Sequence, residues 1–302
     1  MPSTKPNFFI VGAPKCGTTA LHSALSAHPE AFLSPNKEPH FFARDLKVGS
    51  GWCVRDEASY LGLFSGRTSE RLIGEASPWY LFSKTAAQEI HDFQPEAKIL
   101  ILLRDPVDLI HSVHLQHLNT ANEDLIDLRA ALDAETDRSK GELIPEHAPF
   151  PDCLAYRAIG KLSEQVARYL DIFGSERVKV LLLDDLRADE DAYLRDVCRF
   201  LEIDEEVQLS FGRRNPSRNL TKVDLLLKRL HYKTRLIPNL QRRVPTAVKA
   251  IYRGAVRLLP TARATGISDE LRAELADELR EDVADLSQLI ARDLSAWCQR
   301  RA

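Results

Sequence analysis

The chain has 302 residues, of which 44% are hydrophobic and 28% charged, and its formal net charge is −3 at pH 7. This composition is ordinary for a soluble globular protein of one or two domains. Five cysteines without CxxC spacing argue against a disulfide framework and a zinc site. No apolar stretch approaches the ~20 residues of a membrane span, and the first residues lack a secretory signal, so we expect a cytoplasmic protein.

The predicted elements begin with a strand, a tight loop and a helix near the N-terminus. The apolar run 8–11 meets a turn at 12–14, and helical spacing starts at Thr18. Such a loop wraps backbone N–H groups around a phosphate, and the helix N-terminus adds about half a positive charge. Glycines 12 and 17 have the spacing of a nucleotide triphosphatase loop, but Thr18 stands where that loop has its lysine. The lysine lies inside the loop instead, at Lys15.

Further apolar runs predict more strands, and stretches with helical spacing separate them. Alternating strands and helices favour an α/β fold with a central parallel sheet covered on both faces. Ligands of such sheets bind beyond the carboxyl ends of the strands. The runs cover 72–73, 99–103 and 178–183, and the residues at strand ends are Lys15, Glu75, Arg104 and Asp184.

A second candidate phosphate contact follows the run 99–103. Arg104 ends this predicted strand, and Pro106 suits the first turn of the next helix. Ser112 comes eight residues after Arg104, about two helical turns later. An arginine at a strand end and a serine on the adjoining helix can clamp one phosphate between them.

The last third of the chain is strongly basic and then acidic. Residues 211–266 hold 14 Lys and Arg against one acidic residue, Asp224, and residues 267–302 hold nine acidic against five basic residues. The basic segment is either a solvated helix face, a wall that attracts an anionic ligand, or a membrane-surface contact. We expect one long helix over residues 267–297.

Three segments in order resemble the sulfotransferases that use 3′-phosphoadenosine 5′-phosphosulfate (PAPS). The loop with its lysine at Lys15 resembles their 5′-phosphosulfate loop. Residues 74–80, GEASPWY, resemble the GE-x-[ST]-x-x-Y segment of bacterial and heparan-sulfate-type members, and Arg-Asp-Pro followed by Ser112 resembles their 3′-phosphate signature.

The resemblance implies a three-layer P-loop-like fold with a central parallel sheet in a single domain over residues 1–302. Residues 1–220 would form the α/β core and residues 221–302 a helical extension. It also implies transfer of a sulfuryl group from PAPS to a hydroxyl or amine of a carbohydrate or small metabolite. The product would be adenosine 3′,5′-bisphosphate (PAP), no metal would be required, and no nucleic acid would be a partner.

The donor would be held by the first loop, the Arg-Asp-Pro helix and a later basic loop, FGRRNPSRN. Lys15, a compact movable cation, would neutralise the leaving oxygen. The expected donor-binding residues are Lys15, Cys16, Gly17, Thr18, Thr19, Ala20, Arg104, Ser112, Arg213, Asn215, Ser217 and Arg218.

The acceptor proton needs a general base, and two carboxylates compete for this role. Glu75 ranks first, because it follows a strand and lies in the segment that the resemblance links to the base of the heparan N-sulfotransferase type. Glu38 in KEPHFF ranks second: with His40 it matches the 3-O-sulfotransferase type, but Ala43 occupies the position of that type's aspartate.

Other interpretations stay open. Asp184 and Asp185 can imitate the magnesium carboxylates of a kinase or nucleotide triphosphatase, and the basic segment suits a non-catalytic nucleotide-binding or membrane-surface protein. The histidines at 111, 114 and 117 share one helix stripe and are packed, solvated or, for His114, a base. Trp79 and Tyr80 either line the acceptor site or are half-buried aromatics.

Overall fold

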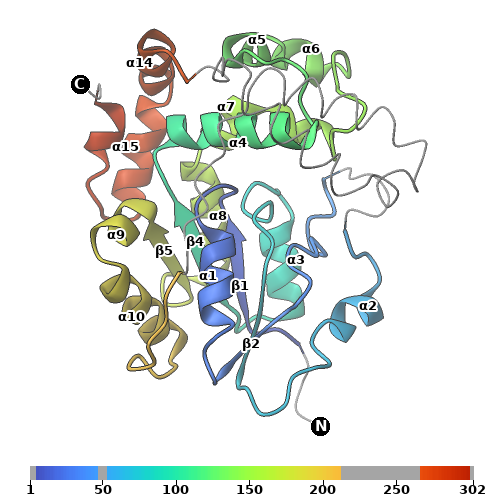
Figure 1. Ribbon diagram of the computed structural model, residues 1–302, viewed down its shortest axis with the longest axis vertical. Helices are drawn as coiled ribbons and strands as arrows, with labels where there is room; N and C mark the ends of the chain where they lie inside the picture. Colours follow the sequence, from blue (N-terminus) through green and yellow to red (C-terminus); the bar gives the residue numbers. More distant parts are fainter. Residues whose placement is uncertain (1–4, 47–52, 212–265, 300–302) are drawn as a thin grey trace, which may run out of the picture.

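The computed structural model describes residues 5–46, 53–211 and 266–299, and within them the chain forms one parallel sheet of five strands (Figure 1). The strand order is β2-β3-β1-β4-β5. The bounds are β1 Phe8–Gly12, β2 Ala31–Leu33, β3 Leu72–Ala76, β4 Lys98–Leu103 and β5 Val178–Leu182. The predicted parallel α/β sheet is confirmed. Strand β2 was not predicted, because its three residues are too few for a recognisable apolar run.

Strand β1 lies in the middle of the sheet and is buried along its whole length. Phe9 lies opposite Glu75 of β3 on one side and Ile99 of β4 on the other. The strand is apolar throughout because helices cover both faces of the sheet. Gly74 allows β3 to approach closely, since a Cβ there would lie 2.1 Å from the Phe8 ring.

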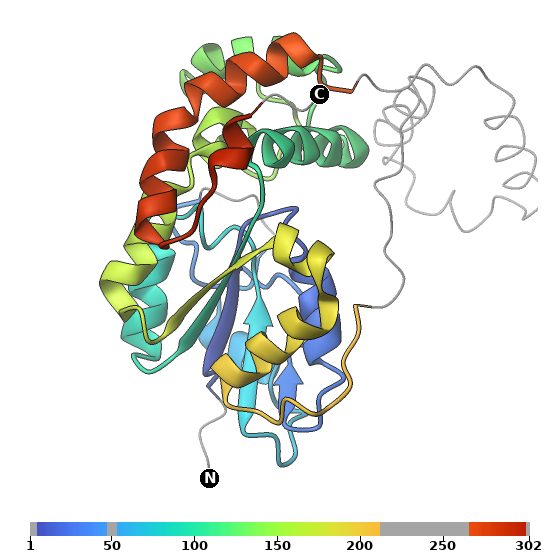
Figure 2. The same cartoon turned by 90° about the vertical axis from the view of Figure 1, so that its left-hand side faces the viewer.

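Helices form a layer on each face of the sheet, and a longer helix crosses its carboxyl edge (Figures 1 and 2). Figure 2 shows α1 and α10 on one face and α3 and α8 on the other, with α4 above the strand ends. These helices are α1 Thr18–Leu25, α3 Ala86–Phe93, α4 Pro106–Thr120, α8 Ser163–Phe173 and α10 Glu190–Leu201.

Shorter helices complete the core and its carboxyl side. They are α2 Glu57–Gly62, α5 Leu128–Asp133, α6 Glu135–Ser139, α7 Tyr156–Gly160 and α9 Leu183–Ala188, with a 3-10 turn, η1, at Pro151–Leu154. In the described ranges no helix combines the length and the apolar character needed to cross a membrane.

The expected single helix over residues 267–297 is wrong, because the chain forms two helices and a turn there. The elements are α14 Asp269–Glu278, α15 Arg280–Leu289 and the 3-10 turn η3 Ser295–Cys298. Leu279, only 1% exposed, separates the two helices. The break lets α14 contact α4 while α15 contacts α8, so both bury an apolar face.

Polar contacts fix this C-terminal part onto the core. The Asp282 carboxylate accepts a hydrogen bond of 2.7 Å from the Leu162 N–H and thereby caps the start of α8. The indole N–H of Trp297, a buried residue, donates to Asp184 at 3.0 Å, next to the end of β5. The described C-terminal helices therefore belong to the same packed body as the sheet.

Candidate functional site

The loop after β1 and the start of α1 form an anion cradle at the carboxyl edge of the sheet. Gly17 has φ 94°, a left-handed conformation that favours glycine, and as the N-cap of α1 it supplies no side-chain hydrogen bond. The first N–H groups of a helix have no partner within it. Those of Thr18, Thr19 and Ala20 can therefore bind a phosphate. The Cys16 N–H already donates to the Ala13 carbonyl at 3.3 Å, so it fits this role less well than predicted.

Lys15 is the exposed cation of this loop. Its backbone has φ 63°, and its Nζ donates to Oε1 of Gln116 on α4 at 3.2 Å. Partial burial and the charge of Arg104 lower the pKa of Lys15, whereas the charge of Glu38 raises it. A negatively charged ligand would relieve the repulsion between the two cations.

Arg104 ends β4 beside this loop, as its position in the sequence predicted. Its guanidinium donates to the Lys15 carbonyl at 3.3 Å and lies 3.5 Å from Asp108. Its Nε is buried and has no hydrogen-bond partner within the described part of the chain. Ser112 lies on α4, half-buried. The structure therefore brings Lys15 and Arg104 together at one edge of the sheet.

Glu38 is the accessible carboxylate near these cations. Its side chain is 38% exposed, pairs with Lys37 and lies 3.9 Å from Nε2 of His40. His40 is fully buried, and burial lowers its pKa to about 3, so its ring is neutral at pH 7. The effect of Glu38 on the pKa of Lys15 places the carboxylate within electrostatic reach of the cradle.

Three of the predicted site residues have left-handed backbone conformations. In the described ranges seven non-glycine residues have positive φ, and three of them are Lys15 at 63°, Glu38 at 66° and His40 at 47°. Left-handed conformations of such residues cost about 1 kcal/mol or more each and persist where surrounding contacts impose them. The loop with Lys15 and the segment with Glu38 and His40, which carry the candidate charged groups, therefore also contain strained backbone.

Glu75 occupies a different position from the one expected of a general base. Its side chain is completely buried at the end of β3. Oε1 accepts hydrogen bonds from the hydroxyls of Tyr60 and Tyr80, both at 2.8 Å, and Oε2 accepts one from Ser77 at 2.6 Å. Burial raises the pKa of Glu75 to about 7, against the opposing effect of these hydrogen bonds. A carboxylate enclosed in this way does not reach an acceptor, so its placement does not fit the first-ranked role.

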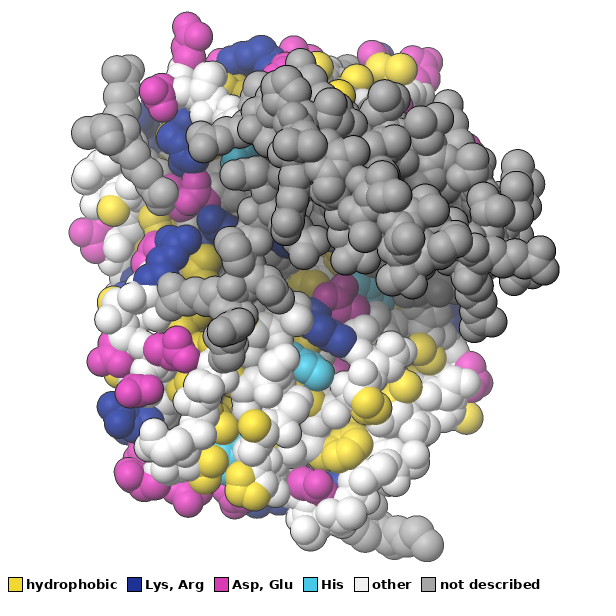
Figure 3. Space-filling view, viewed as in Figure 1, with side chains coloured by type: hydrophobic (Ala, Val, Ile, Leu, Met, Phe, Trp, Pro, Cys, Tyr) yellow, Lys and Arg dark blue, Asp and Glu magenta, His cyan; other side chains and the backbone are white. Residues whose placement is uncertain are grey.

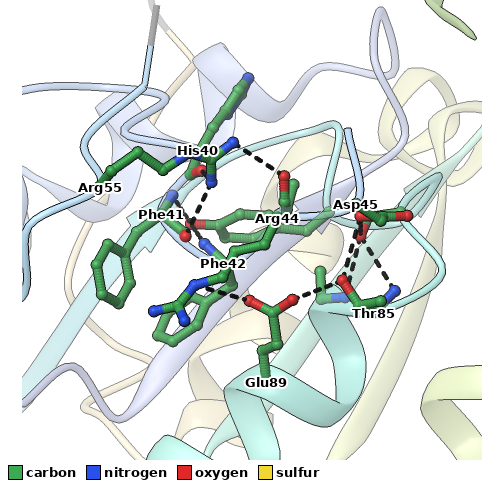
Figure 4. A network of polar contacts seen from close by, with 12 residues as sticks. His40, Phe41, Phe42, Arg44, Asp45, Arg55, Thr85 and Glu89 are labelled. Atoms are coloured by element: carbon green, nitrogen blue, oxygen red, sulfur yellow. Dashed lines mark hydrogen bonds and ion pairs between the residues drawn. The ribbon is translucent and has the colours of Figure 1, made fainter. Parts of the chain in front are cut away.

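Polar contacts hold residues 40–45, which follow Glu38 in the sequence (Figure 4). The Arg55 guanidinium donates to the carbonyls of His40 and Phe41, both at 3.2 Å. Farther along, Asp45 accepts a hydrogen bond of 2.8 Å from the Lys84 N–H. Asp45 thus contacts the residues just before α3.

The histidines and aromatics of this region are mostly packed. His114 on α4 is buried and contacts the Leu125 carbonyl through Nε2 at 2.9 Å, which favours the packed interpretation over a base. The Trp79 ring stacks on His117 with centroids 6.2 Å apart. Tyr80 is fully buried among the partners of Glu75, so it is more buried than either of its two predicted interpretations implies.

The remaining predicted donor contacts are Arg213, Asn215, Ser217 and Arg218, and these lie outside the described residues, as does most of the basic segment. Asp184 and Asp185 are engaged with the C-terminal part through Trp297 and Arg292. In the space-filling view, basic, acidic and histidine side chains lie next to one another near the middle of one face (Figure 3). Charged groups of both signs therefore reach the surface there.

Sequence and structure comparisons point to one family. The family model described as "Sulfotransferase domain" matches residues 5–223. A crystal structure of a sulfotransferase from Alicyclobacillus acidocaldarius is 32% identical, with a TM-score of 0.74, over 98% of this chain and 99% of that chain.

Two curated relatives match over shorter shares of their length. Carbohydrate sulfotransferase 15 of Rattus norvegicus is 26% identical over 266 residues, 71% of this chain and 47% of that protein. Heparan sulfate glucosamine 3-O-sulfotransferase 6 of Mus musculus is 32% identical over 114 residues, 38% of this chain and 31% of that protein. The chain thus spans about half or less of the length of these relatives.

The buried carboxyl of Glu75 predicts a pH dependence of stability. Because its folded pKa of about 7 exceeds the ordinary value of 4.5, the unfolded chain ionises first as the pH rises. The neutral carboxyl contributes its full stabilisation below pH 4.5. This contribution to the free energy of unfolding is lost between pH 4.5 and pH 7, by up to about 1.4 kcal/mol for each pH unit. The free energy of unfolding of the wild type should therefore fall across this window relative to that of Glu75→Gln, as urea titrations at a series of pH values will measure. A constant difference between the two proteins would contradict the assigned burial.

Proposed function

The chain belongs to the sulfotransferase domain family, and we propose that it is an enzyme that transfers a sulfuryl group from PAPS to a hydroxyl or amine of an acceptor. The observation that carries this proposal is the pairing of Lys15 with Arg104 beside the open N-terminus of α1. Two adjacent cations and the first N–H groups of a helix, which have no partner within the helix, suit a ligand with several negative charges. A bisphosphorylated nucleotide has that chemistry.

Each donor contact follows from the position of a residue. The first N–H groups of α1 and the hydroxyls of Thr18 and Thr19 would hold the 5′-phosphate. Arg104 and Ser112 would hold the 3′-phosphate, since a guanidinium binds phosphate oxygens in a bidentate manner. Cationic side chains and the helix end would neutralise the nucleotide without a metal.

In the proposed reaction, the bond between sulfur and the oxygen of the 5′-phosphate breaks as a bond forms between sulfur and the acceptor. Negative charge collects on the bridging oxygen, and the ammonium of Lys15 would stabilise it there. Such catalysis consists of positioning and electrostatic stabilisation, by analogy with phosphoryl transfer. The acceptor loses its proton to a carboxylate.

We assign the base to Glu38 in preference to Glu75. A base must come within hydrogen-bond distance of the acceptor. The side chain of Glu38 is 38% exposed, whereas that of Glu75 is enclosed by three hydroxyls. The charge of Glu38 also acts on Lys15, as expected for a base close to the reacting group.

The names of the relatives support a carbohydrate hydroxyl as the acceptor, since both matched curated proteins are named for carbohydrate or glucosamine sulfation. A nucleotide triphosphatase is a weaker candidate. Thr18 replaces the lysine that such a loop requires, and Asp184 and Asp185 contact Trp297 and Arg292, which leaves them poorly suited to hold magnesium.

Replacing Lys15 should impair turnover far more than donor binding. We expect Lys15→Ala to lower kcat by about 10²–10³-fold, because the leaving oxygen loses its cation. The affinity for PAP should fall by only about tenfold, because the helix N–H groups and Arg104 remain. Steady-state kinetics with carbohydrate acceptors and calorimetry with PAP measure the two effects. Lys140→Ala, at an exposed lysine paired with Asp137 on α6, is the matched control; near-normal turnover of Lys15→Ala would refute the assigned role.

Replacing Glu38 separates the two candidate bases. Glu38→Gln keeps the size of the side chain but cannot accept the acceptor proton, so kcat should fall by about 10²–10⁴-fold while PAP binding is retained. The exposed Glu142, changed to Gln, is the control for loss of a surface carboxylate. Turnover of Glu38→Gln close to that of the wild type would exclude Glu38 as the base.

A further inference from the structure

We propose that Glu75 is a positioning residue, which fixes the segment carrying Glu38 by orienting the hydroxyls of Ser77 and Tyr80. The inference rests on the proposed function, because it gives Glu38 the role of base. It assigns a role to a buried carboxylate that does not touch the acceptor.

The hydrogen bonds around Glu75 have a defined direction. The oxygens of Glu75 accept hydrogen bonds from three hydroxyls, and each hydroxyl has one proton to donate. The hydroxyls of Ser77 and Tyr80 direct this proton to Glu75, at 2.6 and 2.8 Å. Their oxygen lone pairs therefore point elsewhere and are available as acceptors.

The hydroxyl oxygens of Ser77 and Tyr80 accept hydrogen bonds from backbone N–H groups. Oγ of Ser77 accepts a hydrogen bond from the His40 N–H at 3.1 Å, and the Tyr80 hydroxyl oxygen accepts one from the Phe41 N–H at 2.8 Å. Both bonds are buried. The Tyr80 hydroxyl oxygen also accepts a longer bond, 3.4 Å, from the Phe42 N–H. Each hydroxyl therefore connects the Glu75 carboxyl to the backbone of the segment that follows Glu38.

The segment of residues 38–41 needs these hydrogen bonds because its backbone conformation is unfavourable. Glu38 and His40 both have left-handed backbone conformations, with φ of 66° and 47°, which are unfavourable for residues other than glycine. The Glu38 N–H donates to the Ala76 carbonyl at 3.0 Å. Three N–H groups of residues 38–41 are thus held by the end of β3 and the residues after it. Hydroxyls free to rotate would hold them less firmly, so the Glu75 carboxyl, by orienting the Ser77 and Tyr80 hydroxyls, fixes the direction in which the Glu38 side chain leaves the backbone.

Tyr60 provides an internal comparison. Its hydroxyl donates to the same Oε1 atom as that of Tyr80, at the same 2.8 Å, and both side chains are completely buried. Among the described residues, only the Tyr80 hydroxyl of these two also accepts a backbone N–H of the Glu38 segment. Tyr60→Phe and Tyr80→Phe therefore remove equal hydrogen bonds from Glu75 but differ in their effect on that segment.

The test compares kinetics and amide hydrogen exchange of the two variants in the full chain. Tyr80→Phe should lower kcat by about 10–100-fold, the effect of misplacing a reacting group by a fraction of an ångström to an ångström, with KM for PAPS unchanged. The Phe41 amide should exchange faster in Tyr80→Phe than in the wild type. Tyr60→Phe should keep the kcat and the Phe41 exchange rate of the wild type, as measured at the same folded fraction.

Equal losses of kcat in both variants, or unchanged Phe41 exchange in Tyr80→Phe, would overturn the proposal. If Tyr80→Phe does not fold, Ser77→Ala tests the other hydroxyl, with the His40 amide as its probe. If the wild type transfers no sulfuryl group, the proposed function fails, while the exchange measurement still decides whether the Glu75 network holds the segment.

Discussion

The arrangement of the site depends on the central place of β1 between β3 and β4. Parallel strands end at the same edge, so the loop that carries Lys15 lies between the end of β3 and the end of β4, where Arg104 follows. Close contact between Phe8 and Gly74 fixes the register of β1 against β3. Without this order, the lysine and the arginine would not meet at the open end of α1.

A second constraint is the burial of the Glu75 carboxyl in the core, where three hydroxyl groups donate hydrogen bonds to it. Burying an acid disfavours its ionised form, and the raised pKa of Glu75 reflects that penalty. Strained backbone occurs at Glu38 and His40, whose N–H groups bind residues next to Glu75, and also at Lys15. Strained backbone and a buried acid beside candidate reactive groups are typical of functional sites. The buried acid and the strained backbone thus lower the stability of the fold at the place where its candidate reactive groups lie.

The sequence predicted the parts of the fold and site that local pattern determines. Continuous apolar runs located four of the strands, and the displaced lysine and the Arg-Asp-Pro turn located the two cations that the structure brings together. The break at Leu279 could not be predicted, because apolar residues continue on both sides of it. Nor could the burial of Glu75, since one of its partners, Tyr60, comes from a separate helix, and only the fold brings that hydroxyl to the carboxylate.

The most direct test of the account is a crystal structure of the full chain with bound PAP. We predict the 5′-phosphate at the N–H groups of Thr18 and Thr19 with Lys15 Nζ beside it, the 3′-phosphate at Arg104, and the Glu38 carboxylate facing the 5′ end of the nucleotide. A nucleotide bound away from the β1–α1 loop, or with Glu38 directed away from its 5′ end, would contradict the account.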